Sequence, residues 1–199
     1  MKNKPLLIGL CGPIGAGKTT VADLLVANHG FTEITFKQPI IDALLNIFPD
    51  LTPEHFSDRR LKETLCTWTM TSPFGWMEKS PRDLAKSLGT EWGRDMVHPD
   101  LWVKRAEDSY RKIVECNNGQ GKDVVFSDLR FDNEYNMIKN NGGVVIGVVR
   151  ESIKVDLNLL EHKSEQYTFD VDFTINNSNS LEYLEELVAF QIEKMRRLK

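Results

Sequence analysis

The stretch LLIGLCGPIGAGKTT at residues 6–20 decides the fold. Its first part, Leu6 to Cys11, is a short and mostly apolar run, which is typical of a strand buried on both faces of a parallel sheet. Residues 12–19 then match the pattern G-x-x-x-x-G-K-[ST], and helical spacing of apolar residues follows from residue 18. A phosphate-binding loop needs this position between a strand and a helix.

The chemistry of such a loop assigns a task to each part of it. Its glycines let successive backbone N–H groups turn toward phosphate oxygens, and the N-terminus of the following helix adds a partial positive charge. We expect Lys18 to reach the β and γ phosphate oxygens and the Thr19 hydroxyl to bind Mg²⁺. The predicted nucleotide site comprises Gly12, Pro13, Ile14, Gly15, Ala16, Gly17, Lys18, Thr19 and Thr20.

Composition restricts the class of protein. The 199 residues are 41% hydrophobic and 27% charged, which is ordinary for one globular domain. Lys plus Arg is 25 and Asp plus Glu is 29, so the net charge of −4 disfavours a general polyanion binder, and we expect no nucleic-acid partner. Cys11, Cys66 and Cys116 are odd in number and far apart, which argues against a disulfide framework. The apolar run at 6–10 is too short for a membrane span or a signal core, so we predict a cytosolic protein with no membrane partner.

Strand and helix signals alternate along the rest of the chain. Strand patterns recur around residues 31–36, 124–127, 144–150 and 171–175, and helical patterns around 18–28, 39–48, 80–88, 100–114, 133–140 and 181–199. Residues 51–76 are polar and less regular, as in a surface insertion. This alternation predicts an α/β fold with three layers, α/β/α, and a mainly parallel sheet.

A P-loop occurs in GTPases, motor ATPases and small-molecule kinases alike, so other residues must discriminate. No Asn-Lys-x-Asp guanine signature follows the loop, and the chain is short for a mechanical ATPase, which favours a kinase. Asp128 and Arg130 follow a predicted buried strand, at the sheet edge where ligands of α/β proteins bind. There Asp128 would hold Mg²⁺ through water or orient the attacking oxygen, although a helix-capping role remains open.

A kinase of a phosphorylated acceptor needs cations beyond the P-loop. Arg82, Arg94, Arg130 and Arg150 lie outside the regular surface charge runs and are candidates. The segment from His162 to Glu165 lies in a polar region that would suit a lid over the phosphates, but it is equally typical of an exposed loop. The tryptophans offer flat faces for a base, although aromatic residues more often pack in a core; they are Trp68, Trp76, Trp92 and Trp102.

Several motifs together resemble the deoxynucleoside monophosphate kinases of the bacteriophage type, P-loop enzymes that transfer the γ-phosphate of ATP to a dNMP. Besides the P-loop, the resemblance rests on Phe36-Lys37-Gln38-Pro39, Lys62-Glu63, Ser80-Pro81-Arg82, Leu88-Gly89-Thr90-Glu91 with Arg94, Asp100-Leu101-Trp102-Val103, Asp128-Leu129-Arg130-Phe131-Asp132-Asn133-Glu134 and His162-Lys163-Ser164-Glu165. Residues 176–187 also resemble the closing segment of many P-loop kinases, where a loop lies near the adenine.

The resemblance implies a single P-loop kinase domain, with a core of residues 1–36, 101–150 and 167–199, a substrate-binding insertion at 37–100 and a lid at 150–166. It implies ATP and Mg²⁺ as cofactors, dNMP phosphorylation for dNTP synthesis in DNA replication, and the host cytoplasm as location. The implied catalytic residues are Lys18, Asp128, Arg130 and Arg150, the last as a lid cation. The implied metal ligands are Thr19 and Asp128, and the implied substrate residues are Arg82, Arg94, Arg130, Glu134, His162, Ser164 and Glu165.

Two alternatives remain open from the sequence. A P-loop kinase of another small acceptor, such as dephospho-coenzyme A or phosphomevalonate, would use the same loop and lid. A P-loop module that binds nucleotide as a switch, without catalysis, would share the loop alone. The accepted bases and the oligomeric state are not encoded in these motifs, so a homodimer also stays open.

Overall fold

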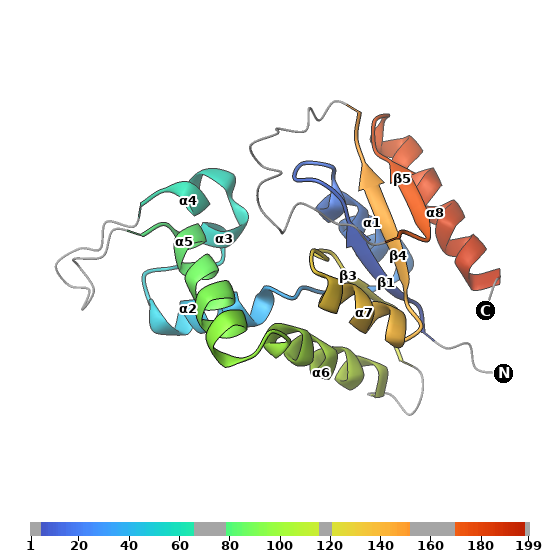
Figure 1. Cartoon of the computed structure of the whole chain (residues 1–199). Coiled ribbons are helices and arrows are strands. Elements are labelled where there is room, and N and C mark those ends of the chain that lie inside the picture. The colour runs from blue at the N-terminus through green and yellow to red at the C-terminus, as the bar shows by residue number, and fades with distance from the viewer. Residues whose placement is uncertain (1–4, 66–78, 116–120, 152–169, 198–199) are drawn as a thin grey trace. The chain divides into compact units, whose positions relative to one another are not determined.

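The computed structural model describes residues 5–65, 79–115, 121–151 and 170–197 (Figure 1). The chain divides into two compact units. Unit 1 comprises residues 1–36 and 106–199, and unit 2 comprises residues 37–105. No helix in the described ranges is long and apolar enough to cross a membrane.

Unit 1 is built on a parallel sheet. Its strands are β1 (Leu7–Cys11), β2 (Thr32–Ile34), β3 (Val124–Phe126), β4 (Val144–Val149) and β5 (Phe173–Asn176), in the spatial order β2-β3-β1-β4-β5. Every strand pair is parallel, and β1 lies between β3 and β4, with Ile8 opposite Val125 and Gly9 opposite Val145. The predicted α/β class with a parallel sheet is confirmed, and the P-loop follows the central strand.

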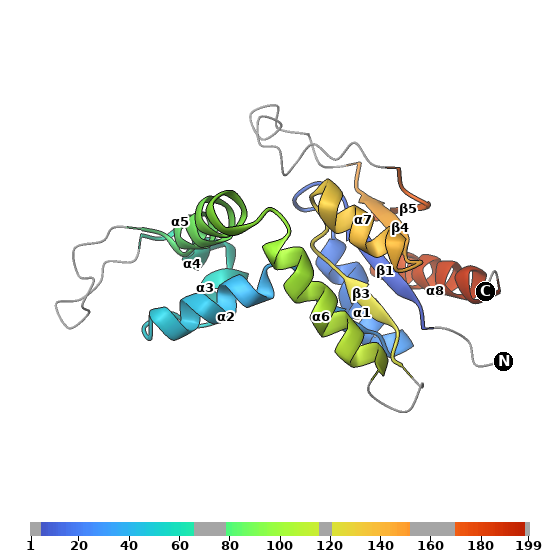
Figure 2. The same cartoon turned by 60° about the horizontal axis from the view of Figure 1, so that its bottom comes forward.

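One face of the sheet is covered by α1 (Lys18–His29) and α8 (Leu181–Arg197), as Figures 1 and 2 show. Because side chains alternate along a strand, Ile8 and Leu10 of β1 point to this face, where they join the main hydrophobic core. The helices contribute residues at helical spacing, such as Leu184, Val188 and Ile192. Burial of each such side chain contributes about 1.5–3 kcal/mol, so this layer fixes both the sheet and the start of α1.

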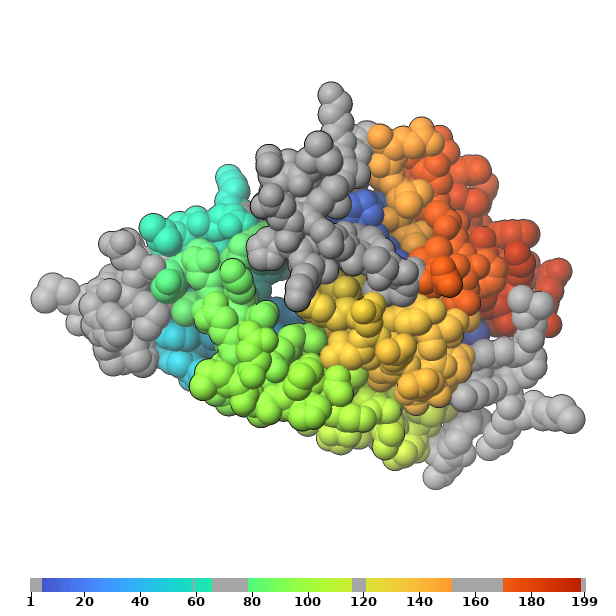
Figure 3. Space-filling view, viewed as in Figure 1, coloured from blue at the N-terminus to red at the C-terminus, as the bar shows by residue number. Residues whose placement is uncertain are grey.

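The opposite face is covered by α7 (Asp132–Asn140). Gly9 of β1 lies beneath this helix, and a Cβ there would be 3.1 Å from Leu129 and 3.3 Å from Ile138. The missing side chain therefore lets α7 approach the sheet closely. Figure 3, viewed as Figure 1, shows the yellow-to-orange surface that α7 forms in unit 1. Helices on both faces confirm the predicted three layers.

Helix α6 (Leu101–Glu115) contributes its residues from Ala106 onward to unit 1, where Ala106 and Tyr110 are buried. Burial raises the pKa of the Tyr110 phenol above its usual value. The spacing of four positions between these two buried residues agrees with the helical pattern predicted around residues 100–114.

Unit 2 is helical, with α2 (Gln38–Ile47), α3 (Glu54–Ser57), α4 (Arg59–Glu63), α5 (Pro81–Lys86) and the π-helix η1 (Ser87–Val97). A separate small core, with Ile41, Leu44 and Phe56 among its members, holds it together. The irregular region predicted at 51–76 contains two short helices within its described part. The second one, α4, is capped by Asp58, whose carboxylate accepts hydrogen bonds from the N–H groups of Arg60 and Leu61.

The π-helix surrounds a buried tryptophan. Trp102 Nε1 donates a 2.7 Å hydrogen bond to the Gly89 carbonyl, and a Cβ at Gly93 would lie 2.5 Å from that nitrogen. The wide turn and the missing side chain of Gly93 therefore make room for the indole, which is 6% exposed. Trp102 is therefore a buried residue, whereas its neighbour Trp92, whose ring centroid lies 6.4 Å away, is 46% exposed. Trp68 and Trp76 lie outside the described residues.

Candidate active site

The predicted residues of unit 1 gather at the carboxyl edge of the sheet. Because all strands are parallel, the segments that follow β1, β3, β4 and β5 leave the same edge. These segments are the P-loop, residues 127–130, Arg150 and the loop that begins at Asn177. The N–H of Leu129 donates to the carbonyl of Leu10, so the segment after β3 is joined directly to the end of β1.

The P-loop adopts a conformation that only glycine tolerates at several positions. Gly12, Gly15 and Gly17 have φ angles of 140°, 84° and 97°. A Cβ at Gly12 would also collide with the carbonyl oxygen of Val148 in β4. The left-handed Gly17 directly precedes α1, whose first turn has no acidic residue, so the partial positive charge of the helix N-terminus faces the loop uncompensated.

Lys18 lies across the loop. Its Nζ donates to the carbonyl oxygens of Gly12, at 2.6 Å, and Pro13, at 3.0 Å. The half-buried ammonium is thus held beside the backbone that would surround a phosphate, while Thr19 is exposed and Thr20 half-buried in the first turn of α1. Burial raises the pKa of the Cys11 thiol to about 11, and the Lys18 charge opposes this shift only in part. Cys11 is therefore a neutral core residue beneath the loop.

Asp128 is fixed at the end of β3. Its Oδ1 accepts a 2.9 Å hydrogen bond from the N–H of Phe36, and the Phe36 ring stacks on Phe126 with centroids 4.8 Å apart. Its carboxylate and the Thr19 hydroxyl are oxygen ligands of the kind Mg²⁺ prefers. Among the described residues, no three His, Cys, Asp or Glu side chains cluster in a way that could hold a metal ion.

Glu134 holds the backbone at the start of α7. The side chain is 2% exposed, and its Oε2 accepts hydrogen bonds from the N–H groups of Arg130, at 2.8 Å, and Phe131, at 3.2 Å. Sequence reasoning placed Glu134 at the substrate and did not foresee this contact, although an acid at the third position of a helix is a known capping signal. The contact fixes the chain that carries Arg130.

Arg150 is exposed and directly follows β4. The next residue, Glu151, is bound to the loop after β5: its N–H donates to Ser178 Oγ at 2.9 Å, and its carboxylate accepts from Asn176 at 3.1 Å. The predicted lid residues His162, Ser164 and Glu165 lie outside the described residues.

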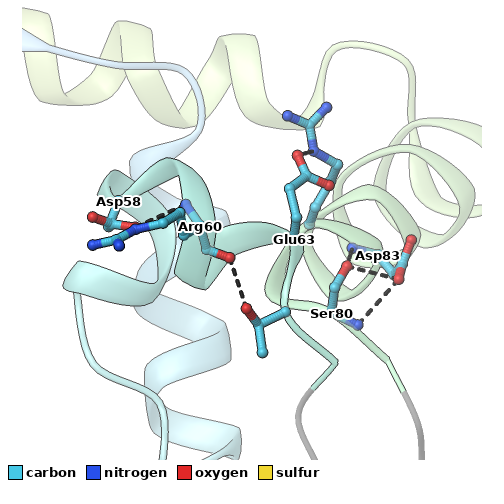
Figure 4. Close-up of polar contacts among 7 residues, drawn as sticks. Asp58, Arg60, Glu63, Ser80 and Asp83 are labelled. Carbon is cyan, nitrogen blue, oxygen red and sulfur yellow. Dashed lines mark hydrogen bonds and ion pairs between the residues drawn. The ribbon is translucent and has the colours of Figure 1, made fainter.

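Two predicted arginines belong to unit 2. Arg82 pairs through Nε with Glu63 Oε1 at 2.6 Å, with both side chains about half exposed (Figure 4). It follows Ser80, which forms a capping box with Asp83 at the start of α5. Hydrogen bonds from the Ser80 hydroxyl and backbone lower the pKa of Asp83.

The other predicted arginine, Arg94, donates to the Pro99 carbonyl at 3.3 Å within unit 2. The structure thus describes Arg82 and Arg94 inside their own unit. Their convergence with Lys18, Arg130 and Arg150 on one cleft stays a prediction.

Asn177 is a contact residue of the P-loop that the sequence did not reveal. Its side-chain Nδ2 donates a 2.9 Å hydrogen bond to the carbonyl of Ala16, although 161 positions separate the two residues. The only sequence signal was the resemblance of residues 176–187 to a closing segment of P-loop kinases.

Comparison with solved structures agrees with this geometry. TT1252 from Thermus thermophilus matches with a TM-score of 0.54 and 19% identity, over 96% of this chain and 98% of that one. Dephospho-CoA kinase from Campylobacter jejuni matches with a TM-score of 0.51 and 16% identity, over 96% and 97%. The sheet, its central P-loop and these neighbours define the fold of a P-loop kinase.

Two viral proteins then identify the family, although no protein-family model matches the chain. An Acanthamoeba polyphaga mimivirus protein named deoxynucleotide monophosphate kinase is 31% identical over 158 residues, 76% of this chain and 77% of that protein. Deoxynucleoside-5'-monophosphate kinase of Escherichia phage T5 is 26% identical over 187 residues, 67% of this chain and 72% of that one. The chain belongs to the viral deoxynucleoside monophosphate kinase family.

Proposed function

We propose that this protein transfers the γ-phosphate of ATP to a deoxynucleoside 5'-monophosphate, yielding ADP and the corresponding diphosphate. The observation that carries the proposal is the complete glycine-rich loop at the carboxyl edge of the sheet, with Lys18 lying across it, in a member of this family. The reaction would supply dNTP synthesis for DNA replication, in the cytoplasm of a host cell.

On the donor side, Lys18 exchanges partners when ATP binds. Its ammonium is held by two neutral carbonyl oxygens, of Gly12 and Pro13. Phosphate oxygens carry a full charge and form stronger hydrogen bonds with a cation than a carbonyl does. The ammonium therefore moves to the β and γ phosphate oxygens, and backbone N–H groups of the glycine-rich loop surround them.

Thr19 and Asp128 are the residues that would hold Mg²⁺. When bound, the ion would neutralise part of the negative charge of the phosphates. The bond from the N–H of Phe36 fixes the Asp128 carboxylate at the sheet edge before any ligand arrives. A general base is unnecessary, because the oxygen of the acceptor phosphate is already ionised at neutral pH.

On the acceptor side, Arg82, Arg94 and Arg130 bind the α-phosphate of the dNMP. Glu63 engages Nε of Arg82, which leaves the terminal nitrogens of the guanidinium oriented for phosphate oxygens. For Arg130, the Glu134 contact fixes the main chain from which the side chain projects. Arg150 would act as the lid cation on the migrating phosphoryl group, with His162, Ser164 and Glu165 contributing from the lid to the substrate.

A coupled assay of ADP release tests the proposal against its alternatives. ATP and Mg²⁺ are supplied with each dNMP in turn, and separately with dephospho-coenzyme A and phosphomevalonate. We expect turnover with at least one dNMP. Turnover only with another acceptor would make this a different small-molecule kinase, and tight ATP binding without any acceptor-dependent turnover would make it a nucleotide switch.

A further inference from the structure

The loop after β5 is joined to the phosphate-binding loop through one side chain. Asn177 Nδ2 donates to the carbonyl of Ala16 at 2.9 Å, and the N–H of Asn177 donates to the carbonyl of Val149 at 2.7 Å. Since a carbonyl only accepts, the amide must present its nitrogen to Ala16. Asn177 thus connects the P-loop to the last residue of β4.

The side chain of Asn177 also packs directly against Gly17. A Cβ at Gly17 would collide with Nδ2 of Asn177, so the side chain occupies the space that any other residue at position 17 would need. Gly17 has a left-handed backbone, with φ 97° and ψ 24°, and directly precedes Lys18. The asparagine therefore packs against a position of the loop that only glycine can occupy.

The bond also sets the direction of a backbone N–H group. In a trans peptide the C=O and the N–H point to opposite sides. Anchoring the Ala16 carbonyl on Asn177 therefore holds the Gly17 N–H on the side away from Asn177, where we expect the phosphates to bind. Preorganised N–H groups of this kind bind phosphate without a cost of reorganisation at the moment of binding.

We propose that Asn177 is a positioning residue for ATP: it holds the Ala16–Gly17 peptide in the orientation that binds the triphosphate. The inference rests on the proposed function, because it concerns the donor half of the same site. It assigns no role to Asn177 at the acceptor, so the acceptor KM provides an internal control.

Two substitutions test the proposal, and equilibrium binding of a fluorescent ATP analogue with Mg²⁺ is the primary measurement. Asn177→Ala removes the hydrogen bond and should raise the dissociation constant about fivefold to tenfold. Asn177→Asp keeps the shape but places a carboxylate against the Ala16 carbonyl and near the phosphates, so a rise of about 30-fold or more is expected.

Asn136, an exposed asparagine within α7 and outside the loops at the carboxyl edge of the sheet, provides the controls Asn136→Ala and Asn136→Asp. Both should bind the analogue within about twofold of the parent, because surface substitutions of this kind have small effects. In turnover, the Asn177 variants should show a raised KM for ATP with an unchanged KM for the dNMP. Circular dichroism melts of the ligand-free proteins establish that each variant is folded.

The outcomes separate the two claims. Parental binding by both Asn177 variants, or a loss of thermal stability with unchanged ATP affinity, would overturn the positioning role alone. A parent protein that does not bind the ATP analogue would overturn the proposed function and this inference with it. Equal losses in the Asn177→Asp and Asn136→Asp variants would show a general charge effect and would also refute the inference.

Discussion

Substitution of Glu134 by Gln separates a structural role of this side chain from a role at the substrate. The carboxylate is 2% exposed and accepts two backbone hydrogen bonds at the start of α7. Gln keeps the size and one acceptor oxygen but removes the charge. If Glu134 serves to hold the backbone, the loss should appear in the stability of the folded protein.

The magnitude follows from the contacts. Hydrogen bonds to a charged group contribute about 1.5–3 kcal/mol and neutral ones about 0.5–1.5 kcal/mol, and the charge at a helix N-terminus adds about 0.3–1 kcal/mol. Part of each bond survives in the amide, so we expect a destabilisation of about 2 kcal/mol. For a domain of this size each kcal/mol lowers Tm by about 2–4 °C, so Tm should fall by about 4–8 °C.

Asp132→Asn is the matched control, because Asp132 is an exposed acid in the same first turn. It should lose only the helix-dipole contribution, about 0.3–1 kcal/mol, and its Tm should fall by less than about 4 °C. Thermal melts and steady-state kinetics of both variants give the comparison. A Glu134→Gln protein that melts no lower than the control but shows a raised KM for the dNMP would refute the backbone role and place the carboxylate at the substrate.

Further predictions concern the phosphate loop and Cys11, which lies beneath it. Lys18→Ala should abolish turnover, measured by ADP release, while the circular dichroism spectrum stays that of the parent; a parental rate would show that the loop is not the donor site. Gly12→Ala should abolish ATP binding, because its Cβ would collide with the Val148 carbonyl. Gly30→Ala is the control: a Cβ there meets nothing within 4 Å, so the variant should lose about 1–2 kcal/mol of stability and still bind ATP. Equal effects of the two substitutions on ATP binding would contradict this. Burial raises the pKa of the Cys11 thiol from 9.0 to about 11. Cys11 should therefore react with iodoacetamide at pH 8 about 100-fold more slowly than a free thiol, which mass spectrometry can measure. Rapid labelling of the native protein would contradict this burial. Since ionisation of the thiol favours the unfolded chain, the contribution of Cys11 to stability should be complete below about pH 9 and lost as the pH rises through about 11.

Local chemistry explains what the sequence could predict. The P-loop requires glycines, a lysine and a hydroxyl within a few residues, so its pattern and its place between strand and helix are visible without a structure. The start of α5 at Ser80 was predictable for the same reason, since capping by Ser80 and Asp83 acts over three positions.

Long-range contacts explain what the sequence could not predict. The π-helix η1 accommodates Trp102, whose bond to Gly89 joins residues 13 positions apart, and no local pattern of η1 encodes that partner. The bond between Asn177 and Ala16 spans 161 positions and depends on the order of strands in the sheet. Such contacts form only after the fold has brought their partners together.

Transfer of labelled phosphate tests the central claim most directly. The parent protein is incubated with Mg²⁺, ATP labelled at the γ-phosphate and each dNMP, and the products are separated by anion-exchange chromatography. The proposed function predicts label in a deoxynucleoside diphosphate, with an equal amount of ADP, and no label in the Lys18→Ala reaction. Label that remains in ATP, or appears only as inorganic phosphate, with every dNMP would contradict it.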